Sequence, residues 1–510
     1  MSNNFYKYLE KKYKVILLII VVLGAGLRLI DTHKKLIWQD EAETVINSIQ
    51  VIEDGYPHGY FKGKKIFESK LRIEIDDPVY AYTESNFYGS KYENNKGWLG
   101  YYYLAPFVKI FGVSELSVRL PFLLFYILTT ILIFRLSQIF FDNKIISLLA
   151  CFLFAIDPVS ILYGKQARYY SIIMLMAPAL LYFNYLYTKN KRIIYLWLLT
   201  TSLILTFHTH ILLCSFIILF LIYYNFLKTK TIKLDKYIVY NLGYFLLCTV
   251  PWLILVKFWT NFETHGIASS DLNFIPILWI IGVLLYLALY RVYKFITKDK
   301  KYLHINEIIP SYLLHFFCGY LIIFPILIPA ESFSDRIFIS LLPLFTIIIS
   351  RLIYKIFIKK RTKLTITLIF LLSIYLVLMF GLRAQMFYGK NSWINSVIRY
   401  AQETNLKNDD LLITNWHDLT LSLYTDYNIY PLYTLNPDFV NNYPNRVLAI
   451  MSLKAMIPNG TTNKPRIHEN LILEEARFYN FSDRLKNCKK VYIDQYTLIF
   501  DCPKLENYEK

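Results

Sequence analysis

Charged residues are scarce in this sequence of 510 residues. Asp, Glu, Lys and Arg together make up 18% of it, whereas a typical soluble protein has about 25%. Hydrophobic residues make up 55%, and the mean hydropathy is positive at +0.37. This balance argues against an ordinary soluble protein and favours a chain that is largely embedded in lipid.

Several motifs that would identify a soluble enzyme class are missing. The sequence has no glycine-rich phosphate loop, no cysteine spacing of the metal-binding kind, no internal repeat and no low-complexity tract. A nucleotide site of the P-loop type is therefore not expected, and neither is a cysteine-based metal centre.

The six cysteines fall into two groups. Four lie within apolar segments, where we expect them to fill the core: Cys151, Cys214, Cys248 and Cys318. The other two, Cys488 and Cys502, flank residues 489–501, which have the pattern of a strand, a turn and a strand. A hairpin brings its two ends together, and the outer compartment can be oxidising, so we expect a disulfide between them.

The apolar residues form blocks rather than amphipathic stripes, and about eleven blocks are long enough, or nearly so, to cross a bilayer. We expect the first to be an uncleaved span rather than a signal peptide, because it runs on into Arg28 and many spans follow it. The predicted spans are 15–31, 118–136, 145–162, 171–187, 193–209, 211–227, 237–258, 275–293, 308–328, 337–354 and 364–382.

Lysine and arginine clusters alternate between the spans, so that they fall on one side of the membrane. This positive-inside pattern accounts for the net charge of +18 without a nucleic-acid partner. The N-terminus is therefore predicted to be cytoplasmic and, with an odd number of spans, the C-terminus extracytoplasmic. We expect a multi-pass protein of the cytoplasmic (inner) membrane.

Two long polar segments then lie outside the membrane, a loop of residues 32–117 and a tail of residues 383–510. We divide the chain into a transmembrane catalytic module, residues 1–382, and an extracytoplasmic domain, residues 383–510. The tail is predicted to be a small α/β domain, in which a helix at 392–403 packs on the membrane face. Its strands are predicted at 410–414, 446–452, 490–493 and 497–500.

Two adjacent carboxylates, Asp40 and Glu41, follow the first span on the predicted outer side. A hydroxyl group is a poor nucleophile until its proton is removed, and a carboxylate held at the membrane surface supplies the base that glycosyl transfer needs. The alternative is an ordinary polar loop, because two solvated carboxylates cost little free energy.

Cations at the outer ends of spans break the positive-inside rule and need a reason. Pro158 is expected to end or kink the third span, and Lys165 and Arg168 follow it. Arg336 repeats the situation before the tenth span. An anionic lipid phosphate is one reason for such cations, and snorkelling to lipid headgroups is the other.

Two histidines, His208 and His210, mark the outer end of the fifth span. Residues two apart point to nearly opposite sides of a helix, so they share a metal only if the helix has ended. We predict packing or substrate contact rather than a metal site. No cofactor is expected, although a divalent cation stays open as an alternative.

Together these residues resemble the GT-C superfamily, and within it the bacterial branch of the dolichyl-phosphate-mannose–protein mannosyltransferase family, which includes aminoarabinose transferases acting on lipid A. Two departures concern substrate recognition: residues 96–101 stand where the family has a run such as His-Pro-Pro, and Gln166 replaces an acidic residue. The shared motifs are Arg28 at the end of the first span, 38–42 (WQDEA), 111–115 (FGVSE), 119–121 (RLP), Pro158 with 167–170 (ARYY), 208–210 (HTH), and Arg336 with Pro343.

The resemblance implies an α-helical polytopic membrane protein of the GT-C type, with about eleven transmembrane helices and the small C-terminal α/β domain. It implies an inverting glycosyltransferase that moves a sugar from a polyprenyl-phosphate donor to a hydroxyl group of a protein, lipid or envelope glycan. Asp40 would be the base, with Glu41 beside it in the catalytic loop. The residues expected to bind substrate are Lys165, Arg168, Tyr169, His208, His210 and Arg336.

Two rival hypotheses remain. A transporter or flippase of lipid-linked glycans would carry ionisable residues near the middle of the membrane and show repeated halves, neither of which is found. A catalytically inactive scaffold would keep the fold without the chemistry, and the retained Asp40 and Arg168 argue against it.

Overall fold

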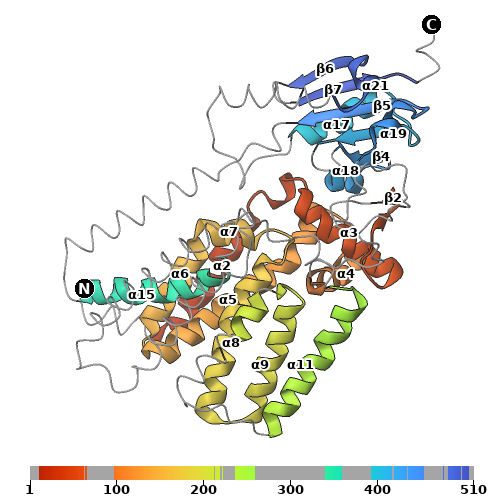
Figure 1. Ribbon diagram of the computed structural model, residues 1–510. Coiled ribbons are helices and arrows are strands. Elements are labelled where there is room, and N and C mark those ends of the chain that lie inside the picture. The colour runs from red at the N-terminus through yellow and green to blue at the C-terminus, as the bar shows by residue number, and fades with distance from the viewer. Residues whose placement is uncertain are drawn as a thin grey trace, which may run out of the picture.

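The computed structural model joins a bundle of apolar helices to a mixed β-sheet at one end of the bundle (Figure 1). The residues described are 11–62, 64–65, 97–211, 213–218, 221, 236–258, 339–358, 392–415, 418–432, 435–452, 475, 480–494 and 497–504.

Four of the described helices are long and apolar enough to cross a membrane: α2 (Tyr13–Leu29), α5 (Glu115–Phe141), α8 (Tyr170–Asn190) and α11 (Lys236–Leu255). Shorter apolar helices, α9 (Ile193–Phe207) and α15 (Leu342–Ile358), pack beside them. These six match the first, second, fourth, seventh, fifth and tenth predicted spans. The predicted spans 275–293, 308–328 and 364–382 lie outside the described residues, as does most of 211–227.

The third predicted span is a bent pair, α6 (Lys144–Ile156) and α7 (Pro158–Gly164), whose axes differ by 62°. Pro158 has no N–H to continue the helix, so the last carbonyls of α6 need other donors. Arg28 of α2 supplies them: its guanidinium donates to the carbonyls of Ala155 and Phe154 at 3.2 and 3.5 Å. It also donates to the Ser160 hydroxyl in α7 at 2.5 Å. The kink predicted at Pro158 is confirmed.

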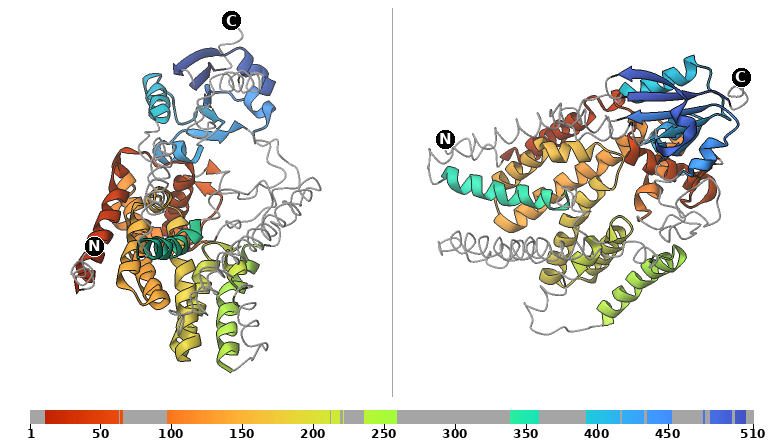
Figure 2. Two further views of the ribbon diagram at one scale, coloured as in Figure 1. Left: turned by 90° about the vertical axis from the view of Figure 1, so that its left-hand side faces the viewer. Right: turned by 45° about the horizontal axis from the view of Figure 1, so that its top comes forward.

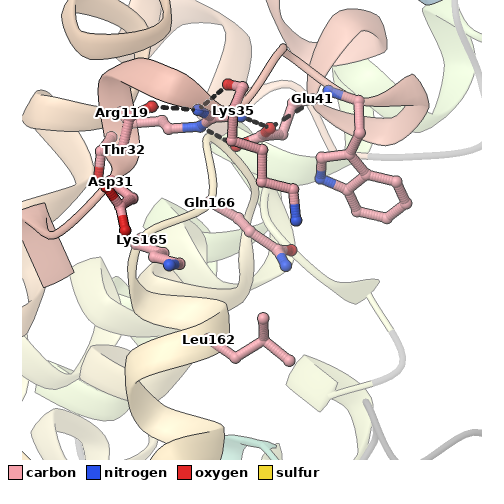
Figure 3. A pocket seen from close by; sticks show the side chains of 9 residues that line it. Asp31, Thr32, Lys35, Glu41, Arg119, Leu162, Lys165 and Gln166 are labelled. Carbon is pink, nitrogen blue, oxygen red and sulfur yellow. Dashed lines mark hydrogen bonds and ion pairs between the residues drawn. The ribbon is translucent and has the colours of Figure 1, made fainter. Parts of the chain in front are cut away.

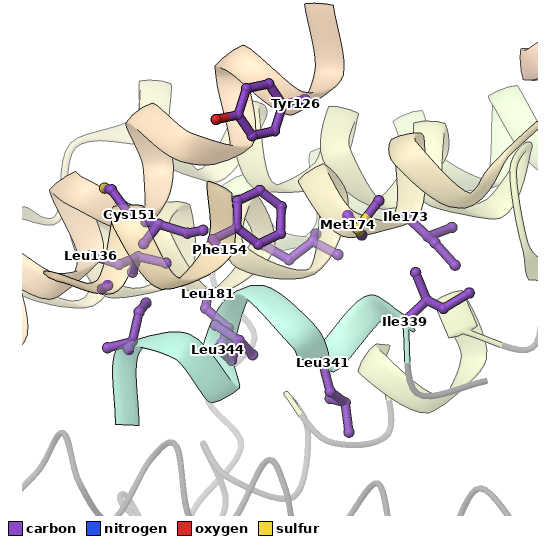
Figure 4. Close-up of a cluster of buried hydrophobic side chains, with 14 of the residues drawn as sticks. Tyr126, Leu136, Cys151, Phe154, Ile173, Met174, Leu181, Ile339, Leu341 and Leu344 are labelled. Atoms are coloured by element: carbon purple, nitrogen blue, oxygen red, sulfur yellow. The ribbon is translucent and has the colours of Figure 1, made fainter. Parts of the chain in front are cut away.

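Apolar side chains face outward on the bundle, among them Leu18 and Val22 of α2 and Leu247 of α11. Such exposure is costly in water and costs nothing in lipid. Behind these faces a shared core joins α5, α6, α8 and α15, with Phe154 and Leu344 inside it (Figure 4). Several apolar helices thus form a multi-pass membrane protein.

The ends of the helices fall into two sets, as alternating spans require. At one set of ends Asn143 Nδ2 donates to the Tyr354 hydroxyl at 2.9 Å, and Lys144 lies over the ring of Tyr13. The opposite ends of α2, α5, α7, α8 and α9 gather beneath the first polar segment. Every described site residue predicted from the sequence lies in or beside this second set.

The first polar segment contains helices that the sequence analysis did not predict. A short 3₁₀ turn, η1 (Thr32–Lys34), leads into α3 (Gln39–Asp54), which ends at Gly55 with φ of 84°. After the two-residue strands β1 (Tyr60–Phe61) and β2 (Lys64–Lys65), α4 (Leu99–Phe111) packs along α3.

The C-terminal part of the chain forms a five-stranded sheet in the order β4-β3-β5-β7-β6. Strands β4 and β5 run parallel to β3, whereas β7 is antiparallel to both β5 and β6. The strands are β3 (Leu411–Thr414), β4 (Asn428–Pro431), β5 (Val447–Ser452), β6 (Lys489–Asp494) and β7 (Thr497–Cys502), with helices α17 (Ser392–Glu403), α18 (Asp418–Tyr424), α19 (Pro437–Asn441) and α21 (Asp483–Lys486).

Helix α17 has the predicted bounds but a different partner. Ile394, Val397 and Ala401 pack against Leu448 and Ile499 of the sheet, so the helix covers the sheet and not the membrane face. The expected Cys488–Cys502 disulfide is present. Figure 2 shows that the sheet lies at the end of the bundle where α3 and α4 are found.

Candidate active site

Glu41 is the anchor of the loop between α2 and α3. Arg119, on the first turns of α5, binds both oxygens of the Glu41 carboxylate: Nε donates to Oε1 at 2.8 Å, and Nη2 contacts Oε2. The backbone N–H of Ala167 also donates to Oε1, at 2.9 Å. Burial opposes ionisation, but Arg119 and these hydrogen bonds lower the pKa of Glu41 below its usual value. Glu41 is therefore a buried, ionised and fully bonded carboxylate.

Arg119 also holds the backbone that precedes α3. Its Nη1 donates to the carbonyls of Thr32 and Lys35 at 2.8 and 2.7 Å, and its Nη2 to that of Leu36 at 3.0 Å. One guanidinium thus closes residues 32–36 into a tight turn over the end of α5. This turn fixes where α3 begins, and with it the position of Asp40.

Asp40 follows Gln39 in the first turn of α3. Its side chain points away from that of Glu41, and 22% of it is exposed. Arg168 holds it, with Nη2 3.2 Å from Asp40 Oδ2 and Nη1 donating to the Asp40 carbonyl at 2.7 Å. The same Nη1 donates to Glu43 Oε2 at 3.0 Å. Burial opposes the charge, but the two carboxylates raise the pKa of Arg168 well above its ordinary value.

A small cavity of about 20 Å³, partly open to solvent, is lined by Glu41 and Arg119 of this network (Figure 3). Lys35 and Lys165 extend into it from opposite walls, and Gln166 forms part of its floor. Burial, with nearby positive charge, lowers the pKa of each lysine to about 8. The buried Gln166 Oε1 has no hydrogen-bond partner among the described residues. Asp31, Glu41 and Arg119 also line the cavity, so three cations face two carboxylates there, and the excess of positive charge favours an anion.

The remaining predicted residues divide into two groups. The guanidinium of Arg168 lies over the ring of Tyr169, and that ring lies 5.7 Å from the ring of His210. His208 turns away, and its Nε2 bonds the Cys248 carbonyl at 3.0 Å within an aromatic cluster around Trp252. Arg336 lies outside the described residues. In the described part of the chain, no group of three His, Cys, Asp or Glu side chains is placed to hold a metal.

Three residues of the site were not predicted: Lys35, Glu43 and Arg119. Arg119 carried a signal, since it is a cation at the predicted outer end of a span, the same anomaly that identified Lys165 and Arg168. Glu43 lies one helical turn beyond Asp40, a spacing that places both on one face only if the segment is helical. Lys35 had no distinguishing signal in the sequence.

The arrangement combines a partly exposed carboxylate, Asp40, held by a buried arginine, with a cavity that the neighbouring Glu41 lines together with two lysines. A carboxylate in such a position can accept a proton, and the ammonium groups can bind or stabilise an anion. These two capacities are what a transfer of a group from a phosphate to a hydroxyl requires.

Comparison with known families identifies the central part of the chain. The family model described as "Dolichyl-phosphate-mannose-protein mannosyltransferase" matches residues 95–255, which contain Arg119, Lys165 and Arg168. A search of curated proteins gave no match.

Solved structures share the fold over almost the whole chain. ArnT from Cupriavidus metallidurans bound to undecaprenyl phosphate has a TM-score of 0.59 at 12% identity, covering 98% of both chains. Its apo state gives 0.60 at 13% identity, covering 96% of this chain and 98% of ArnT. The apo Archaeoglobus fulgidus oligosaccharyltransferase gives 0.52 at 11% identity, covering 87% of this chain and 70% of that one.

Residues 95–255 therefore match this mannosyltransferase family, and the chain shares its fold with ArnT and with the archaeal oligosaccharyltransferase. The resemblance drawn from the sequence and the expected enzyme class, a glycosyltransferase, are both confirmed. The transporter alternative finds no support in these matches.

Proposed function

We propose that the chain transfers a sugar from a polyprenyl-phosphate donor to a hydroxyl acceptor on the outer face of the bacterial cytoplasmic membrane. One observation carries the proposal: Asp40, with 22% of its side chain exposed, directly precedes Glu41, which lines a cavity together with Lys35 and Lys165. The acceptor belongs to a protein, a lipid or an envelope glycan.

The cavity is proposed to hold the donor phosphate. Lys35 and Lys165 provide the positive charge, and Arg336 is proposed to add to it. The structural relative ArnT, whose structure contains undecaprenyl phosphate, supports a lipid phosphate as the ligand. A lipid tail would leave the cavity along the apolar helix faces, where it loses no contact with the membrane interior.

Asp40 is proposed to act as the base. It takes the proton of the acceptor hydroxyl while the oxygen forms a bond to the anomeric carbon of the sugar. The bond between that carbon and the phosphate oxygen breaks, the phosphate leaves with the electron pair, and the single displacement inverts the anomeric centre. The ammonium groups of Lys35 and Lys165 stabilise the charge that develops on the leaving phosphate.

The remaining site residues receive roles that follow from their contacts. Arg168 bonds two carboxylates, so we propose that it orients Asp40 rather than reaching the phosphate itself. Glu41 is proposed to anchor the loop through Arg119 and not to exchange protons. Tyr169 and His210 are proposed to contact the substrate from the far side of Arg168, and His208 to shape the neighbouring aromatic wall.

The orientation in the membrane is part of the proposal. The helix ends that carry the site are opposite to those that carry the lysine clusters, and lysine-rich loops face the cytoplasm. The N-terminus would then be cytoplasmic and residues 383–510 an extracytoplasmic domain. A cysteine introduced at exposed Tyr492 should react with an impermeant reagent in intact cells, and one at exposed Lys189 should not.

Purified protein in proteoliposomes provides the test of the activity. We expect it to release polyprenyl phosphate and glycosylate an envelope acceptor when given polyprenyl-phosphate sugar, and to ignore nucleotide sugars. Chelation of divalent cations should leave the rate unchanged, because the lysine ammonium groups supply the charge that a cation would supply. Movement of intact lipid-linked sugar across the bilayer without bond cleavage would contradict the proposal.

A further inference from the structure

Helix α18 of the C-terminal sheet region lies against α3, next to the residue proposed as the base (Figure 1). The N–H of Thr420 donates to Gln39 Oε1 at 3.3 Å, and Gln39 directly precedes Asp40. Leu419 is fully buried in the cluster that contains Ala42 and Val45 of α3. One short helix, about 380 residues away in the sequence, thus covers the first turns of α3.

Tyr424, the last residue of α18, makes a second tie. Its hydroxyl accepts a hydrogen bond from the N–H of Ile37 at 3.0 Å and donates one to Glu115 Oε1 at 2.8 Å. The side chain therefore connects the loop before α3 to the first residue of α5. A third tie follows at the end of α18, where Lys62 Nζ donates to the Thr425 carbonyl at 3.0 Å.

The loop of residues 36–39 is consequently held from two sides. From the bundle side, Arg119 donates to the carbonyls of Lys35 and Leu36. From the sheet side, Leu36 packs against the cluster beneath α17, and Tyr424 binds Ile37. Neither the Arg119 contacts nor the Tyr424 contacts alone determine both the position of the loop and the direction in which α3 starts.

We infer that Tyr424 is a positioning residue for Asp40, and that the C-terminal sheet region forms part of the active site rather than an appended domain. The inference rests on the proposed function for its effect on rate. Its structural part, a loop held by the Tyr424 hydroxyl, is independent of the reaction. Tyr424 touches no reacting atom in this account, because it acts through the backbone of Ile37 and the start of α3.

The test compares Tyr424→Phe with Tyr492→Phe, which removes a hydroxyl from an exposed tyrosine of the same sheet. Tyr424→Phe should lower kcat about tenfold with the KM for the lipid donor unchanged, since the phosphate cavity is formed by other side chains. Tyr492→Phe should match the wild type. Rates are expressed per folded protein, so that a mere loss of stability does not count as an effect.

Amide hydrogen exchange on the full-length protein provides the second readout. In Tyr424→Phe, the amides of Ile37 and of the first turn of α3 should exchange faster, while those of β5 and β7 keep their protection. Unchanged exchange at Ile37 together with unchanged kcat would overturn the inference. If the wild type transfers no sugar but exchange at Ile37 still responds, the proposed function fails and the positional coupling stands.

Discussion

Asp40 and Glu41 are adjacent carboxylates in one turn of one helix, and the structure treats them in opposite ways. Glu41 is fully buried and chelated by Arg119, with a backbone N–H on the same oxygen as the Arg119 Nε. Asp40 keeps 22% of its side chain exposed and forms an ion pair with Arg168. Solvent therefore reaches the carboxylate of Asp40 more readily than that of Glu41.

Solvent access alone distinguishes the structural role proposed for Glu41 from the chemical role proposed for Asp40. Both carboxylates have an arginine partner, and both arginines are buried. What differs is exposure, since 22% of the Asp40 side chain is exposed and 1% of the Glu41 side chain. Three variants and one pH profile test this contrast. They are given from the largest expected effect to the smallest.

Glu41→Gln should produce the largest loss, and the loss should be in stability. It leaves Arg119 as a buried charge without its carboxylate, which typically costs about 3–5 kcal/mol. Thermal unfolding in detergent should show a much lower midpoint, with little change for Glu53→Gln on the exposed end of the same helix. A stable but inactive Glu41→Gln would give the chemical role to Glu41 instead.

Lys165→Ala should weaken use of the donor. A charge-assisted contact to phosphate is worth about 1.5–3 kcal/mol, so the KM for lipid-phosphate sugar should rise by roughly 10- to 100-fold. Lys189→Ala, at the exposed opposite end of α8, is the matched control and should leave KM unchanged. Equal KM values in both variants would show that the cavity does not hold the phosphate.

The pH dependence should follow the two lysines. Each has a pKa lowered to about 8, so the protonated forms that bind phosphate are present below pH 8 and are lost as pH rises through it. The kcat/KM for the donor reports the free enzyme and should fall about tenfold between pH 8 and pH 9. A flat profile up to pH 10 would mean that neither lysine contributes.

Glu43→Gln should have the smallest effect. Arg168 loses one of its two carboxylates but keeps its contacts with Asp40. The loss of about 1 kcal/mol in orienting interactions should reduce kcat roughly fivefold, with KM for the donor unchanged. A larger loss in Glu43→Gln than in Asp40→Asn would exchange the roles of these two residues.

The sequence predicted the parts of the fold that depend on local pattern. Blocks of apolar residues located the spans, Pro158 located the break between α6 and α7, and four of the five strands of the C-terminal sheet were predicted. Helix α17 was predicted with its bounds but not its partner, because an amphipathic helix shows which face is apolar and not what covers it. Strand β4 was missed because it is short and ends at Pro431.

The site was predicted only in its residue types. Asp40, Lys165 and Arg168 were identified from unusual placement, but the sequence could not show that Arg168 bonds Asp40 and Glu43. Nor could it show α18 against α3, because that contact joins residues about 380 positions apart and depends on the whole chain folding. Long-range pairing of buried charges leaves no periodic trace in a single sequence.

The central claim is that Asp40 removes the proton from the acceptor, and Asp40→Asn in the reconstituted transfer assay tests it most directly. The amide keeps the shape and loses the basicity, so kcat should fall by roughly 10²–10⁴. Donor binding and thermal stability should stay close to those of the wild type, because Arg119 and Glu41 still hold the loop. Transfer by Asp40→Asn at the wild-type rate, in a folded protein that binds donor, would contradict the account.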